Sequence, residues 1–131
     1  MLKTIASVTV ASLILAAPAI AKNGDRSDRA EVRKAGSCGP GATSKLKLKT
    51  DDGAIEAEFE VDRNRNRERW RVTFARGGRV VVRTSATTRA PSGSFSVERR
   101  LRDLRGADRV TARGVGPSGL TCTATATLRA R

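Results

Sequence analysis

Five arginines occupy alternate positions near the middle of the chain: Arg63, Arg65, Arg67, Arg69 and Arg71. In an extended strand, alternate side chains project from one face at steps of about 6.6 Å. Guanidinium groups bind phosphate and carboxylate oxygens through paired N–H donors. The spacing therefore predicts a candidate anion-binding stripe. The alternative interpretation is a solvated outer face, opposite inward-facing Trp70 and Val72.

The remaining basic residues give the whole chain a strong positive charge. It has 26 lysines and arginines against 13 acidic residues, a formal net charge of +13. A second cluster is partly neutralised by Glu98, Asp103 and Asp108, and it consists of Arg99, Arg100, Arg102, Arg105 and Arg109. Such a charge predicts attraction to anionic polymers and anionic surfaces.

Enzyme chemistry has few candidate residues in this sequence. The chain has no histidine, which removes the commonest general base and transition-metal ligand. Asp51-Asp52-Gly53 supplies too few oxygens for calcium, which takes about six or more, whereas Asp-Gly is a preferred hairpin turn. We therefore expect no catalytic residue, no metal site, no cofactor and no enzyme activity.

Base-specific recognition of nucleic acid is not expected either. Proteins that bind single strands stack bases on exposed aromatic side chains. Here Phe59, Trp70, Phe74 and Phe95 all fall on the alternating apolar positions of expected strands, which assigns them to the core. The segment from Arg76 through two glycines to Arg79 is similar to one RGG element, but a hairpin turn explains it better.

The first 21 residues have the layout of a secretory signal peptide. Lys3 precedes an uncharged stretch from 4 to 17, and Ala19-Ile20-Ala21 offers a cleavage site. Cleavage would remove one lysine and leave a net charge of +12. We expect no transmembrane segment in the remaining chain, because a span needs about 20 apolar residues. The excess of arginine over lysine suggests a bacterial source. We expect a secreted bacterial protein that its charge could hold at the cell envelope.

The rest of the chain reads as a short tail followed by one domain. Residues 22–36 are charged and poor in apolar side chains, which predicts a disordered tail. Residues 37–131 are expected to form a single domain with a modest core. Cys38 and Cys122 are the only cysteines, so an oxidising compartment predicts one disulfide.

One hairpin can be placed with its register. Residues 45–49 alternate lysine with leucine, residues 55–60 alternate glutamate with apolar residues, and Asp52-Gly53 lies between them. A two-residue turn there sets each lysine opposite a glutamate and puts the apolar side chains on the other face. The predicted charged pairs are Lys45–Glu60, Lys47–Glu58 and Lys49–Glu56.

Further alternating segments predict an all-β fold. A third strand runs from about Arg69 to Ala75, and the turn at Gly77-Gly78 leads to the valines at 80–82. We expect a longer loop or a bulge at the glycines, which sets Phe74 against Val80. Residues 85–93 are expected to form a loop, 101–104 an irregular link, and Cys122 to Leu128 the last strand. The total of about seven strands predicts an antiparallel two-sheet sandwich.

Trp70 on the third strand resembles the buried strand-C tryptophan of immunoglobulin domains. Over residues 44–128 the chain is similar in architecture to immunoglobulin-like and fibronectin-type-III-like sandwiches. Its cysteines differ, since Cys38 precedes the first strand and Cys122 lies on the last. Segments 60–70 and 88–95 also resemble small secreted bacterial proteins.

Three functional hypotheses follow, the last of which is a plain structural or adhesive role in which the charge only keeps the protein soluble. The first is a secreted, non-enzymatic binding module that engages anionic envelope or extracellular material through the alternating arginines. The second is a secreted protease inhibitor that presents the loop from Thr88 to Ser94. There Arg89 would be the specificity residue, followed by Ala90 and Pro91.

Overall fold

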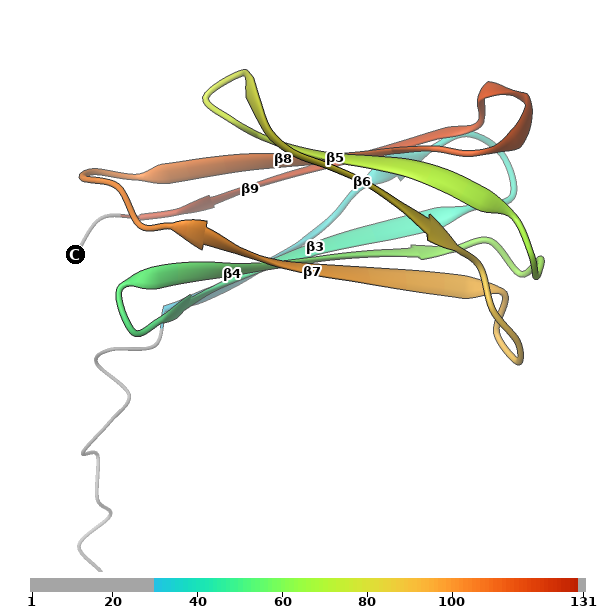
Figure 1. Ribbon diagram of the computed structural model, residues 1–131, viewed down its shortest axis with the longest axis horizontal. Helices are drawn as coiled ribbons and strands as arrows, with labels where there is room; N and C mark the ends of the chain where they lie inside the picture. The colour runs from blue at the N-terminus through green and yellow to red at the C-terminus, as the bar shows by residue number, and fades with distance from the viewer. Residues whose placement is uncertain (1–29, 130–131) are drawn as a thin grey trace, which may run out of the picture.

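A computed structural model describes residues 30–129. Within this range the chain forms nine strands and one short 3-10 helix, with no α-helix. The strands make two antiparallel sheets that pack face to face (Figure 1). The elements are β1 (Glu31–Ala35), β2 (Ser37–Cys38), β3 (Thr43–Asp51), β4 (Ala54–Asp62), β5 (Arg69–Arg76), β6 (Arg79–Thr87), β7 (Ser94–Arg102), β8 (Asp108–Val115), η2 (Pro117–Gly119) and β9 (Thr121–Leu128).

The four-stranded sheet has the order β1-β3-β4-β7, and the predicted hairpin forms its centre. The turn falls at Asp52 and Gly53, whose φ angles of 45° and 75° are those that a two-residue hairpin turn requires. Lys47 lies opposite Glu58, as predicted, and the apolar partners of the two strands face the core. The predicted register is therefore confirmed.

The five-stranded sheet has the order β2-β9-β8-β5-β6, and β5 and β6 are joined at Gly77-Gly78. The predicted longer loop or bulge at the glycines is wrong, because the irregularity lies between Phe74 and Ala75 and shifts the register the other way. Phe74 lies opposite Val82 and not opposite Val80. The two-residue glycine turn is kept, so the additional residue, Val81, is accommodated along β6, where it is 47% exposed.

The core between the sheets is organised around Trp70, which is fully buried as predicted. Its ring centroid lies 5.7 Å from that of Phe95, which in turn lies 6.4 Å from that of Phe59. The indole ring packs directly on the backbone of Gly116, where an added Cβ would come within 2.5 Å of it. The only tryptophan thus forms part of the scaffold and is no exposed ligand platform.

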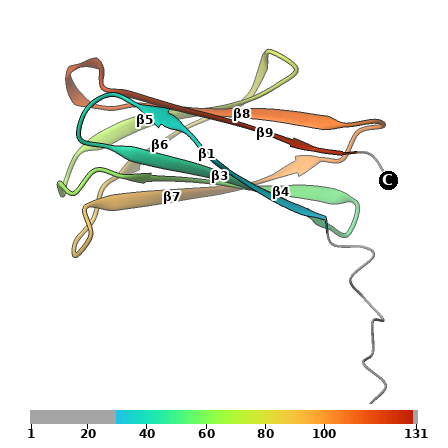
Figure 2. The ribbon, with the colours of Figure 1, turned by 180° about the vertical axis from the view of Figure 1, so that it is seen from behind.

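The N-terminal strands connect the two sheets. β1 lies at the edge of the four-stranded sheet, and after Gly36 the chain enters β2 at the edge of the five-stranded sheet (Figure 2). An added Cβ at Gly36 would lie 2.6 Å from the carbonyl oxygen of Thr123, so this crossing is tightly packed. The Cys38–Cys122 disulfide joins β2 to β9, which confirms the predicted pairing.

The prediction of a disordered tail that extends to Gly36 is wrong for the last residues of that segment. Glu31–Ala35 pairs with β3, and the half-buried Val32 packs against the core. One apolar side chain among charged ones is enough for an edge strand, because only one of its faces is buried. The predicted signal peptide at 1–21 and residues 22–29 lie outside the described residues.

Two other segments differ from the prediction. β6 continues to Thr87, which shortens the loop expected at 85–93, and Leu101 is a buried residue of β7 and not part of an irregular link. These extensions lengthen expected strands, and the two additional strands β1 and β2 account for nine strands in place of about seven. Among the described residues, no helix is long and apolar enough to cross a membrane.

The charged pairs on β3 and β4 can be tested by exchanging their signs. The Lys47 Nζ and Glu58 Oε2 atoms are 3.5 Å apart, and Glu58 also lies opposite Glu98 on β7. Lys47→Glu should therefore lower the free energy of unfolding by about 0.2–1 kcal/mol, and adding Glu58→Lys should recover part of it. Urea unfolding of both single variants and the double variant measures this coupling. A double variant equal to the sum of the singles would contradict the pairing.

Candidate anion-binding site

The alternating arginines do not form one stripe. Asn64 and Arg67 have φ angles of 56° and 64°, so the connection between β4 and β5 is a turn and not an extended strand. Arg65 and Arg67 are exposed on this connection. Only the last two members of the series, Arg69 and Arg71, lie on β5 and share one face of a sheet.

Arg63 is a structural residue. Its Nε atom lies 3.1 Å from Oε1 of Glu68, and its Nη1 donates a hydrogen bond to the carbonyl oxygen of Gly41. The same Glu68 oxygen accepts a bond from the Trp70 indole nitrogen at 3.4 Å. The Arg63 side chain is only 15% exposed. The expectation that it is an exposed ligand contact is therefore wrong, and it holds the β4–β5 turn against the core.

This role predicts a clear difference between neighbouring arginines. Arg63→Gln should lower the free energy of unfolding by about 1–3 kcal/mol, because it leaves the half-buried Glu68 carboxylate without its cation. Arg65→Gln, on the same turn but exposed, should change it by less than about 0.5 kcal/mol. Chemical denaturation of the two variants makes the comparison. Equal stabilities would show that the Arg63–Glu68 pair contributes nothing to the fold.

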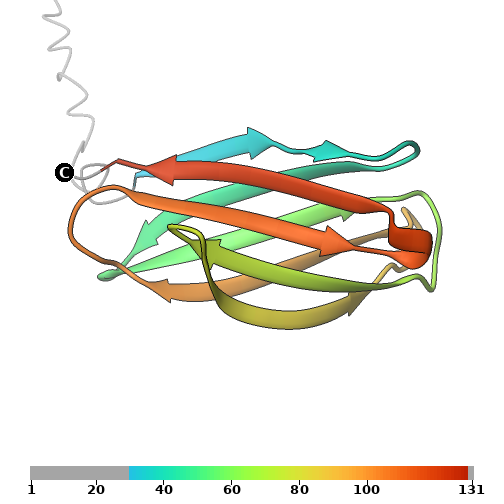
Figure 3. The ribbon, with the colours of Figure 1, turned by 90° about the horizontal axis from the view of Figure 1, so that it is seen from above.

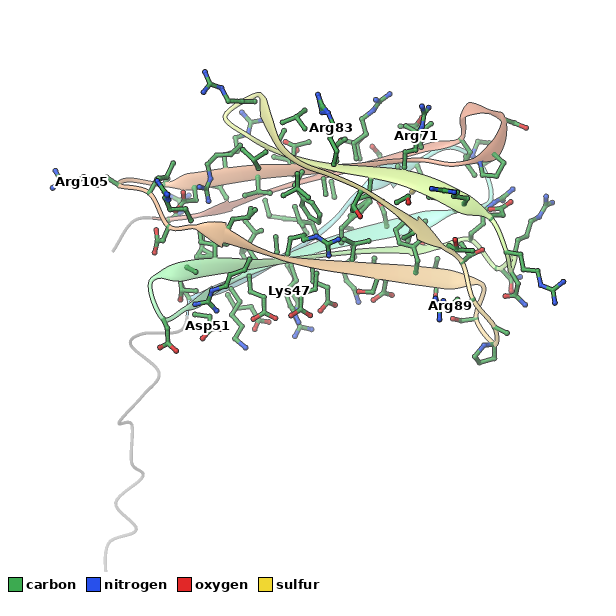
Figure 4. The ribbon with its side chains drawn as sticks, in the orientation of Figure 1. Lys47, Asp51, Arg71, Arg83, Arg89 and Arg105 are labelled. Atoms are coloured by element: carbon green, nitrogen blue, oxygen red, sulfur yellow. A yellow bond between two sulfur atoms is a disulfide. The ribbon has the colours of Figure 1, made fainter. Side chains whose placement is uncertain are left out.

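The arginines that do gather lie on the outer surface of the five-stranded sheet. Their neighbours along each strand, such as Trp70, Val72, Val110 and Ala112, point into the core, so these side chains point outward. Register places β6 and β8 on either side of β5. We call this surface the arginine face, defined by Arg69, Arg71, Arg83, Arg109 and Arg113. Figure 4 shows Arg71 and Arg83 projecting from it, away from the other sheet.

The centre of the arginine face is a shallow hollow of about 360 Å³ between three guanidinium-bearing side chains. Thr73 of β5 lies opposite Arg83 on one side and opposite Arg113 on the other. Arg71 precedes Thr73 by two residues on the same strand. The hollow is lined by Arg71, Val72, Thr73, Arg83, Thr84, Arg113 and Val115. Three cations thus surround a small floor that contains both threonine and valine side chains.

Many of the other side chains on this surface carry hydroxyl groups. Looking down on the sheet, β9, β8, β5 and β6 follow one another across it (Figure 3). β9 presents threonines at 121, 123, 125 and 127, and Thr111 bonds Thr125 across the strands at 2.9 Å. Arg69 is within 3.4 Å of the Ser85 hydroxyl. Among residues 30–129, no carboxylate projects from this face, so its guanidinium groups have no internal anion.

The outer surface of the four-stranded sheet is different, because acids and bases alternate across its strands. Lys45 is 3.8 Å from Glu60, and Arg100 is 3.1 Å from Asp51. The carboxylates are dense enough that a hydrogen bond to the Glu56 carboxylate raises the pKa of Glu98. Lys47 projects from this side of the molecule in Figure 4. The positive charge of the fold is therefore concentrated on one of its two broad surfaces.

The second predicted cluster is dispersed by the fold. Arg99 points toward Thr84 of β6, Arg100 pairs with Asp51, and Arg105 lies on the β7–β8 connection. Arg102 is exposed at the end of β7. Only Arg109 belongs to the arginine face, from its position on β8.

The candidate inhibitor loop is a compact turn. The Arg89 amide donates to the carbonyl oxygen of Ser94 at 3.0 Å, and the Arg89 carbonyl accepts from the Gly93 amide at 2.8 Å. Ala90 and Pro91 form the exposed tip, joined by a cis peptide bond. Both backbone groups of Arg89 are thus used inside the loop. The inhibitor hypothesis gains no support beyond the exposure of the Arg89 side chain.

Sequence reasoning missed Arg83 and Arg113 as members of the site. A signal was available for β8, where Arg109 and Arg113 alternate with Val110 and Ala112 in the same way as the arginines of β5. Compared with protein-family models and with curated proteins, the chain finds no match in either.

Proposed function

We propose that the protein is a non-enzymatic binding module whose arginine face engages a phosphate-bearing polymer. The observation that carries this proposal is the set of five outward arginines on adjacent strands, on a face where the described residues place no carboxylate. Guanidinium groups bind phosphate oxygens through two parallel N–H donors each. A flat array of them suits a repeating anion better than a single small ligand.

The proposed recognition is independent of sequence or monomer identity. The aromatic side chains that could stack on bases or sugars, such as Trp70 and Phe59, are fully buried. The binding free energy would come from release of counterions from the polymer, which makes affinity strongly dependent on salt. Serine and threonine hydroxyls around the arginines would add hydrogen bonds to phosphate oxygens.

The setting we propose is extracellular, with a bacterial source and a chain processed near Lys22. The disulfide of a small domain supports an oxidising compartment. The two packed antiparallel sheets support an immunoglobulin-like architecture. The order β3-β4-β7 matches the immunoglobulin pattern, in which the first two strands are neighbours and a later strand lies beside the second. One difference is that β6 pairs with β5 in the five-stranded sheet, whereas the constant-type immunoglobulin order places the fourth strand in the sheet of the first two.

The proposal is tested by titrating the protein with a duplex DNA oligonucleotide, used as a regular phosphate polymer, over a series of salt concentrations. Five phosphate contacts should give a slope of about −4.5 in a plot of log affinity against log salt. Polyphosphate should compete with the duplex, and an uncharged polysaccharide should not. A slope close to zero, or no measurable affinity at low salt, would rule out the proposed function.

A further inference from the structure

The β5–β6 hairpin projects from the molecule on the side of the arginine face. In Figure 1 and in Figure 2 its tip rises above the plane of the five-stranded sheet, away from the other sheet. Figure 4 shows Arg71 and Arg83 pointing to the same side. A Cβ added at Gly77 or Gly78 would meet no atom of residues 30–129 within 4 Å, so the tip is open to solvent. A flat surface that docks on the arginine face would therefore meet this hairpin as well.

The projecting hairpin carries two neighbouring apolar side chains that are exposed. Val80 is 40% exposed and Val81 is 47% exposed, and in the part of the chain that the structure describes Leu104 is the only other large apolar residue with such exposure. Neighbouring residues of a regular strand point to opposite faces. The register shift between β5 and β6 interrupts this alternation, and Val82 is the first valine of β6 that packs against the core. Apolar surface thus lies on a part of the fold that projects into solvent.

The base of the hairpin is fixed to the rest of the sheet. The Gly77 amide donates a hydrogen bond to the carbonyl oxygen of Arg109 on β8 at 3.3 Å. On the inward side, Nη2 of Arg76 lies 3.5 Å from Oδ1 of Asp108, and both side chains are largely buried. Arg76 is therefore part of the scaffold, whereas Arg79, after the glycines, is exposed. The tip has a defined position beside the arginine face, and a cation accompanies the valines.

These features together indicate the chemistry of the partner. Protein interfaces bury about 800 Å² on each side, and two partly exposed valines supply only a small part of such an area. A second copy docked on the hairpin would set Arg79 and Arg83 against their own equivalents, which is unfavourable. Nucleic acid offers phosphates but no apolar medium for the valines. The surface of a phospholipid bilayer offers both, since its headgroup phosphates cover a hydrocarbon interior.

We propose that the protein docks on an anionic phospholipid bilayer, with the arginine face on the headgroup phosphates and with Val80 and Val81 inserted below them. This docking rests on the function proposed above, because the same arginines supply the electrostatic attraction. The hairpin adds the apolar contact, since its tip rises from the sheet toward the boundary between headgroups and acyl chains. The phosphate array that the arginine face binds is then a lipid surface.

The first test compares vesicles of equal parts phosphatidylglycerol and phosphatidylcholine with a duplex DNA oligonucleotide. The double variant Val80→Ser and Val81→Ser should bind the vesicles about tenfold or more weakly, because the apolar contact is lost. Its affinity for the duplex should stay within about twofold of the wild type, which also shows that it folds. Leu104→Ser is the control, because it removes a similarly exposed side chain on the β7–β8 connection. Its vesicle affinity should stay within about twofold of the wild type.

The depth of the hairpin is measured with vesicles whose acyl chains carry bromine, which quenches tryptophan fluorescence on contact. The variant Val81→Trp should be quenched, whereas the native Trp70 is fully buried and stays unquenched. Vesicle binding that is unaffected by the two serines, with no quenching at position 81, would mean that charge alone holds the protein on the bilayer and would overturn the proposal. Binding to the duplex but not to the vesicles would overturn it and leave the proposed function standing. Failure to bind either would overturn both.

Discussion

Reduction of the Cys38–Cys122 disulfide should lower the melting temperature by about 20 °C or more. The bond joins positions 84 residues apart, and closing such a long loop restricts the unfolded chain by about 4–5 kcal/mol in loop-entropy models. A domain of this size changes its melting temperature by about 4–8 °C for each kcal/mol. Calorimetry with and without reductant measures the change.

The double variant Cys38→Ala and Cys122→Ala is the control for this prediction. It should melt close to the reduced wild type, because β2 pairs with β9 through only two residues and depends on the covalent bond. Titration of the denatured, non-reduced protein should find no free thiol. Two reactive thiols, or a melting temperature unaffected by reductant, would contradict a structural disulfide.

The largest effect on binding is expected from three substitutions at the centre of the arginine face. The variant with Arg71→Gln, Arg83→Gln and Arg113→Gln removes the side chains that surround the hollow. Affinity for duplex DNA should fall by about 500-fold at 0.1 M salt. Each phosphate contact contributes to the binding constant a factor that varies as the salt concentration to the power of about −0.9, and three such factors are lost. The salt slope should flatten by about 2.7.

The matched control removes the same charge elsewhere. Arg65, Arg102 and Arg105 are exposed and lie on the β4–β5 turn, the end of β7 and the β7–β8 connection. Their replacement by glutamine should reduce affinity by about tenfold at most, through the weaker overall field. Equal losses in the two triple variants would mean that net charge alone attracts the polymer and that there is no site.

The central hairpin and the core could be predicted because their signals are local. Asp52-Gly53 fixes the turn, and a one-residue slip would bury the lysines on either side of Leu46 and Leu48, so the register has one acceptable solution. Trp70 and Phe74 fall in strict alternation, and both are fully buried. In these segments the turn chemistry and the apolar period agree.

The arginine face, the candidate binding site, could not be assembled in the same way, because sheet pairing builds it from distant residues. Arg83 and Arg113 are 30 residues apart in the sequence, yet both lie opposite Thr73. Conversely, the regular spacing from Arg63 to Arg71 crosses a turn in which two non-glycine residues have positive φ angles. Nothing in a period of two distinguishes such a turn from a strand, so the candidate stripe included residues that the fold separates.

The central claim is that a phosphate polymer binds to the arginine face and not to the whole basic surface. It is tested most directly by following the guanidinium Nε–H signals of the protein by NMR while a short DNA duplex is added. The signals of Arg69, Arg71, Arg83, Arg109 and Arg113 should shift together and saturate, while those of Arg65, Arg102 and Arg105 stay in place. Shifts spread evenly over all of these arginines would contradict the proposed site.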